Sequence, residues 1–123
     1  SEMESLEERH NERKKNYQED LDLFRKNIQT KLDELEGQWE EEDYQEALRK
    51  EKEKADELQR QIDALSLDDS LTARNKVTEL RKQLAEQNEK IAKMQQDRER
   101  KLTKESLQDQ LKEYEDTISR GYC

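Results

Sequence analysis

Apolar residues recur three and four positions apart along most of this chain, and no proline interrupts them. This spacing places apolar side chains on one face of an α-helix and is typical of the a and d positions of a heptad repeat. Only 28% of the residues are hydrophobic and 46% are charged, which is too little apolar material for a compact globular core. A disordered chain has a similar charge content, but the regular spacing favours long helices that bury one narrow stripe.

The apolar pattern falls into four phases, two in each half of the chain. They run from Tyr17 to Ile28, from Tyr44 to Leu65, from Val77 to Met94, and from Leu107 to Ile118. Discontinuities separate the phases at residues 37–43 and 98–106. An extra four-residue step locally unwinds a coiled coil, so we expect a stutter or bend at residues 37–43. The two breaks lie about equally far from the middle of the chain, as an antiparallel pairing of its two halves would produce.

The stretch ALSLDDSLTARN, residues 64–75, interrupts the helical pattern near the middle of the chain. Asp68, Asp69 and Ser70 are residue types that compete with the helical backbone for hydrogen bonds and prefer helix starts. We therefore predict a first helical arm over residues 1–66, a turn over residues 67–70 with Asp69 or Ser70 as the N-cap, and a second arm over residues 71–123. The alternative is a helix that runs straight through and forms a dimeric rod.

A reversal of the chain at this turn brings the two apolar stripes together as a seam. The predicted seam residues are Leu58, Ile62, Leu65, Val77, Leu80, Leu84 and Ile91. Two registers, one heptad apart, are possible. In the looser one Leu65 faces Val77, Ile62 faces Leu80 and Leu58 faces Leu84, whereas in the tighter one Leu58 faces Val77 and Glu51 faces Leu84. We favour the looser register because apolar residues then meet apolar residues. Glu51 and Gln87 occupy polar slots in the seam and make it imperfect.

The net charge of −9 is unevenly distributed. The first 66 residues contain 12 basic and 21 acidic side chains, and the remainder contains 12 of each. A chain reversal would place the basic cluster Arg98, Arg100, Lys101 and Lys104 alongside the acidic residues between positions 30 and 44. Exposed ion pairs stabilise a fold weakly, so we expect such pairs to set orientation and register. The acidic balance argues against nucleic acid as a partner.

These observations predict an all-α fold: a long antiparallel two-helix coiled-coil hairpin. Apolar positions left outside the seam could pair two copies into a four-helix assembly, so the oligomeric state stays open at this point. The segment GQW, Gly37 to Trp39, invites comparison with small secreted two-helix proteins whose W-x-G motif forms the hairpin turn. The order of residues is reversed here, and we instead expect Trp39 to fill space at the stutter and Gly37 to allow a bend or a close approach of the arms.

No pattern of reactive residues predicts catalysis. His10 is the only histidine, the serines have no histidine partner, and the single cysteine, Cys123, cannot form an internal disulfide. We expect no catalytic, cofactor-binding or metal site, no small-molecule substrate, and a reducing compartment. No apolar run approaches the ~20 residues of a membrane span, and no signal peptide is apparent.

Several motifs in the second half resemble a coiled-coil segment of large phage tail proteins. These are ALSLDDS (Ala64–Ser70), LRKQLAEQ (Leu80–Gln87), the Asp97-Arg98 pair and LQDQLKEYED (Leu107–Asp116), with EEEDYQEALRKEKEK (Glu40–Lys54) upstream. The segment is found above all in tail tape-measure proteins of bacteriophages and prophages of Gram-positive bacteria. Tape-measure proteins are very long helical chains that occupy the tail lumen, fix tail length during assembly, and leave the tail when the genome is injected.

The resemblance implies that this chain is one structural module of a larger tail protein, acting as a spacer or assembly element. It implies partners among copies of the chain and other tail proteins, and a location in the virion tail or in the bacterial cytoplasm during assembly. The main alternative is the coiled-coil arm of a cytoplasmic chromosome-maintenance or repair ATPase, which is also an antiparallel hairpin. Walker motifs in the full-length gene would identify the ATPase, and other tail genes beside it would identify the phage protein.

Overall fold

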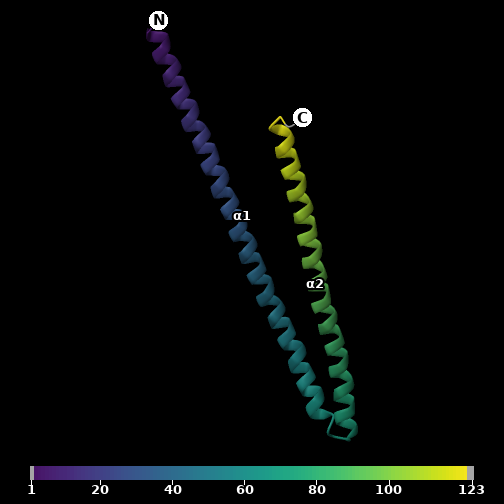
Figure 1. The fold of residues 1–123 in the computed structure, drawn as a ribbon. Coiled ribbons are helices and arrows are strands. Elements are labelled where there is room, and N and C mark those ends of the chain that lie inside the picture. Colours follow the sequence, from purple (N-terminus) through teal and green to yellow (C-terminus); the bar gives the residue numbers. More distant parts are fainter. Residues whose placement is uncertain (1, 122–123) are drawn as a thin grey trace. The chain divides into compact units, whose positions relative to one another are not determined.

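The computed structural model describes residues 2–121 and is all-α in that range, as predicted. Helix α1 spans Glu2–Leu65 and helix α2 spans Leu71–Ser119. Residues 66–70 connect them at the tip of a helical hairpin, where Figure 1 shows the chain reversing. The predicted turn at residues 67–70 lies inside this connection. The chain divides into two units, the first ending at Gln45 and the second beginning at Glu46.

The first unit is a single run of helix. Gln18 donates to Asp22 across 3.0 Å and Gln29 donates to Asp33 across 2.9 Å, and such i, i+4 pairs support an exposed helix. Residues 37–43 are helical throughout, so the predicted stutter does not break α1. Gly37 and Trp39 therefore belong to a helix and not to a hairpin turn. A Cβ atom built on Gly37 meets nothing within 4 Å.

The second unit contains the hairpin and its hydrophobic core. Buried residues lie on one face of each helix, separated by three, four, seven or eleven positions. They are Leu48, Ala55, Ile62, Ala73, Val77, Leu80 and Ile91. This spacing is the a and d pattern of a coiled coil, so the apolar stripe pairs the helices as the sequence predicted. Beyond residue 98, the apolar residues Leu107, Leu111 and Tyr114 are each more than half exposed.

Helix α2 ends at Ser119, and Gly121, two residues later, has a φ of 77°. Glycine adopts this left-handed conformation without a steric penalty and commonly follows the last turn of a helix. The Gly121 amide donates to the carbonyl of Ile118 across 3.0 Å, and the Arg120 amide donates to that of Asp116 across 3.2 Å. These bonds satisfy carbonyls that the helix end would otherwise leave without a partner. Cys123 lies outside the described residues.

Candidate functional site: the hairpin seam and its polar layer

The connection at the tip is held by side chains that replace helical hydrogen bonds. Ser70 is the N-cap of α2, and its Oγ accepts a hydrogen bond from the Ala73 amide across 3.1 Å. The Asp68 carboxylate accepts from the Ser70 amide across 2.8 Å, which forms an Asx-type turn. This backbone donor lowers the pKa of Asp68. Of the two N-cap candidates, the structure therefore selects Ser70, while Asp69 lines a small groove at the tip together with Asp68.

The end of α1 is closed in a complementary way. The Ser66 amide donates to the Ile62 carbonyl across 2.9 Å, and the Ser66 hydroxyl donates to the same oxygen across 2.7 Å. The Asp68 amide donates to the Leu65 carbonyl across 3.0 Å. Ser66 and Asp68 thus satisfy two of the last carbonyls of α1, and Ser70 caps the start of α2. The chain reverses here without a glycine or a proline.

The hydrophobic seam is centred on Ile62, Val77 and Leu80, which are 4%, 9% and 2% exposed. Three partly buried leucines, Leu58, Leu65 and Leu84, pack against them. These six side chains are the ones that the looser register pairs with one another. Ile91, the seventh predicted seam residue, is buried farther along α2. The Glu51–Gln87 contact described below lies between the two registers, because the looser one places Glu51 opposite Ile91 and the tighter one places it opposite Leu84.

Two alanines belong to the buried face as well. Ala55 is 9% exposed and Ala73 is 5% exposed. Ala55 lies in the predicted pattern of the first arm, whereas Ala73 lies before Val77, where the predicted pattern of the second arm begins. Ala73 precedes Val77 by four residues and so occupies the same helix face. The four-residue spacing between Ala73 and Val77 is the sequence feature that indicates the burial of Ala73.

A polar layer lies in the seam, formed by Glu51 of α1 with Gln87 and Lys90 of α2. The Gln87 amide donates to a Glu51 carboxylate oxygen across 2.6 Å and to the Glu51 backbone carbonyl across 2.9 Å. Lys90 Nζ lies 3.1 Å from the other carboxylate oxygen. Glu51 has only 13% of its side chain exposed, whereas Lys90 has 56% exposed. The two polar slots noted separately in the sequence are therefore partners.

The donors around Glu51 determine its electrostatics. Hydrogen bonds from Gln87, from Lys90 and from Lys54, which lies 3.2 Å away on the same helix, lower the pKa of Glu51 to about 2. Burial acts in the opposite direction but is outweighed. Glu51 is therefore ionised in the hairpin at neutral pH, and its charge is compensated within the layer. A buried carboxylate is tolerated in a seam only when its oxygens have such partners.

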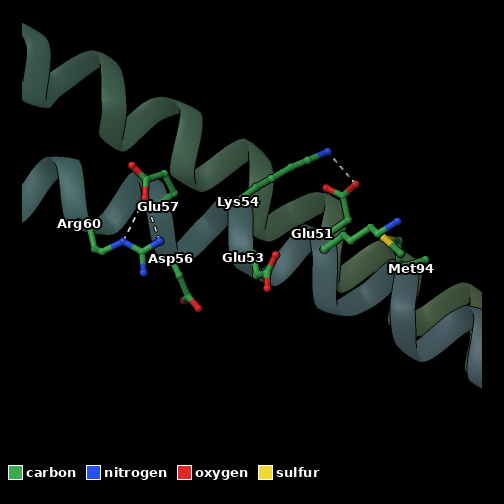
Figure 2. Close-up of a pocket in the computed structure, with 9 residues that line it drawn as sticks. Glu51, Glu53, Lys54, Asp56, Glu57, Arg60 and Met94 are labelled. Atoms are coloured by element: carbon green, nitrogen blue, oxygen red, sulfur yellow. Dashed lines mark hydrogen bonds and ion pairs between the residues drawn. The ribbon is translucent and has the colours of Figure 1, made fainter.

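One side of the polar layer opens onto a groove along α1 (Figure 2). Its lining residues are Ala47, Lys50, Glu51, Glu53, Lys54, Asp56, Glu57, Arg60 and Met94. Figure 2 shows Arg60 turned toward Glu57 and Lys54 turned toward Glu51. The Arg60 partner lowers the pKa of Glu57. Charges of both signs line the groove and pair locally, so the groove is a charged helix surface and not a site built for one ligand.

Within residues 2–121, no three or more His, Cys, Asp or Glu side chains are grouped so that they could hold a metal ion. None of the helices described here is long and apolar enough to cross a bilayer. The described side chains of the seam pair two helices in a defined alignment.

Comparisons with protein-family models, with curated proteins and with solved structures each found no match.

Proposed function

We propose that the chain is a structural coiled-coil module of a phage tail tape-measure or minor tail protein, acting as a spacer or assembly element. The proposal rests on one observation: the buried apolar residues lie between the two helices. In the second unit, the buried residues from Leu48 to Ile91 serve to pair α1 with α2. The faces outside the seam are mostly charged and exposed. Such a molecule supplies length and attachment, and the proposal assigns it no catalysis.

The mechanism is mechanical. An α-helix rises 1.5 Å per residue, so a helix converts a number of residues into a length. Helix α2, with 49 residues, is about 74 Å long. Packing against α1 stiffens the paired region, because an isolated helix in water frays and bends easily. The proposed partners are copies of the same chain and other tail proteins, in the virion tail or in the host cytoplasm during assembly.

Lengthening the hairpin in the gene that encodes it tests the spacer role. Six additional heptads in each helix, with the seam pattern kept, should lengthen the tail by about 63 Å if the module lies in the tail as a hairpin. If the module opens into one straight helix, the same insertion should add about 126 Å. Tail lengths are measured by electron microscopy.

A matched control places the same number of Gly and Ser residues in the connection at residues 66–70. A flexible insertion there adds no helical rise and should leave tail length unchanged. Equal tail lengths with the heptad and the Gly-Ser insertions would contradict the spacer role.

A second candidate is the coiled-coil arm of a chromosome-maintenance or repair ATPase. The antiparallel pairing and the short connection at residues 66–70 are the observations that favour it. In that case the helices would lead away from the tip to the two halves of an ATPase head. Walker motifs on both sides of this segment in the full-length gene would support the ATPase arm and overturn the tail protein.

A further inference from the structure

Glu51 and Gln87 are polar residues in positions that the coiled-coil pattern reserves for apolar ones. Glu51 lies between Leu48 and Ala55 on the buried face of α1, and Gln87 lies between Leu84 and Ile91 on that of α2. They meet across the seam, with 2.6 Å between the Gln87 amide nitrogen and a Glu51 carboxylate oxygen. Two apolar residues would pack here at least as well, because replacing buried polar pairs with apolar residues is often neutral or stabilising. The pair therefore calls for an explanation other than stability.

We propose that the Glu51–Gln87 pair fixes the alignment of α1 against α2. This inference rests on the hairpin itself and is independent of the spacer role. The apolar seam is a poor guide to alignment, because its positions recur every seven residues. After a slide of one heptad, about 10 Å, most seam residues again face seam residues. The two registers left open by the sequence differ from each other by such a slide, and the observed alignment, with Glu51 opposite Gln87, lies between them.

The polar layer distinguishes these alignments. A slide of one heptad places Glu51 level with Leu80 or with Met94, depending on its direction, and separates it from Gln87. The Glu51 carboxylate then loses its amide donor and faces apolar side chains, and Gln87 loses its acceptor. A buried polar group without a partner is costly. The observed alignment satisfies both residues at once: Gln87 also donates to the Glu51 backbone carbonyl, and Lys90 reaches the second carboxylate oxygen.

Distance measurement between two spin labels tests the proposal. The labels are attached at Asp63→Cys on α1 and Lys93→Cys on α2, in a full-length chain in which Cys123 is changed to Ser. Both sites are exposed, and they lie at different levels along the hairpin, so a slide of one heptad changes their separation along the axis by about 10 Å. Labelled chains are diluted with unlabelled ones, so that only distances within one chain are detected by pulsed electron paramagnetic resonance.

The unmodified pair should give one narrow distance distribution. Replacing it with leucines, E51L/Q87L, should add a second distance displaced by about 10 Å, because the slipped alignment then buries only apolar residues. E51Q keeps a hydrogen-bonding partner for Gln87 and is the matched control, with one distance expected. A single, unchanged distribution for E51L/Q87L, with helix content intact by circular dichroism, would overturn the proposal.

The exchanged pair, E51Q/Q87E, provides a second test that does not depend on how the leucine variant folds. It moves the carboxylate to α2 and keeps an amide opposite it, so the alignment should be retained and one distance should be seen. Two distances in this variant would also overturn the proposal, since the pair would be present without fixing the alignment.

Discussion

Leu80 is the most deeply buried side chain of the seam, and its truncation tests whether the seam holds the hairpin together. It is 2% exposed and belongs to the cluster of Ile62 and Val77. Replacing a buried leucine with alanine removes apolar contacts and leaves a cavity, at a cost of about 2–5 kcal/mol. Small proteins unfold with a free energy of about 5–15 kcal/mol. Leu80→Ala should therefore remove a large part of the stability of the hairpin.

The matched control is Leu71→Ala, the same substitution in the same helix at a residue that is 72% exposed. Its effect should be within about 0.5 kcal/mol of zero, as for most surface substitutions. Urea unfolding followed by circular dichroism at 222 nm gives both values, and the difference between the two midpoints is the quantity of interest.

Leu80→Asp is a stronger version of the same test, because it places a carboxylate among apolar side chains that offer it no hydrogen bond. The hairpin should unfold, with a loss of ellipticity and of melting temperature. An unchanged spectrum and melting temperature for Leu80→Asp, or equal midpoints for Leu80→Ala and Leu71→Ala, would refute the assignment of Leu80 to the seam.

Three further predictions concern the cap, the polar layer and the single glycine of α1. Ser70→Ala removes the acceptor of the Ala73 amide and should cost about 1 kcal/mol in urea unfolding, whereas Ser106→Ala, in the exposed interior of α2, should cost much less. The hairpin lowers the pKa of Glu51 from 4.5 to about 2, so the unfolded chain binds the extra proton between these values. Stability should therefore be complete above about pH 4.5 and fall as the pH approaches 2, with a weaker dependence in Glu51→Gln, as measured by thermal unfolding across this range. Gly37→Ala should stabilise α1 locally by about 0.5–1 kcal/mol, because the added methyl group meets nothing within 4 Å, and slower amide hydrogen exchange around residue 37 would show it.

The hairpin could be predicted because its determinants are local. The spacing of Leu58, Ile62 and Leu65 indicates which face of α1 is buried. The residue types at 68–70 favour a helix start. The structure then distinguishes Ser70 as the cap and Asp68 as the residue of the Asx turn. Sequence alone left Asp69 and Ser70 equivalent, because both residue types cap helices and the choice depends on one backbone conformation.

The polar layer could not be predicted in the same way. A charged or amide residue in a seam slot looks like a defect when each helix is considered separately. Its partner is identified only by the alignment of the two helices, which neither helix encodes by itself. Buried alanines are also hard to predict, because alanine is common on both faces of a helix. Ala73, which is buried, therefore does not stand out in the sequence. The pairing of the basic cluster at residues 98–104 with the acidic residues at 30–44 stays a prediction, since the two units are described separately.

Stability and alignment make different demands on a two-helix seam. Leucines at the seam positions stabilise any alignment in which they meet, so a purely apolar seam would be stable and poorly defined. One satisfied polar layer lowers the free energy of a single alignment relative to its neighbours, even where it adds little to the total. For a spacer this difference has a direct consequence, because a slide of one heptad changes the distance between attachment points by about 10 Å. A module that measures length needs a defined alignment more than it needs additional stability, and Glu51 and Gln87 occupy seam positions that leucine would otherwise fill.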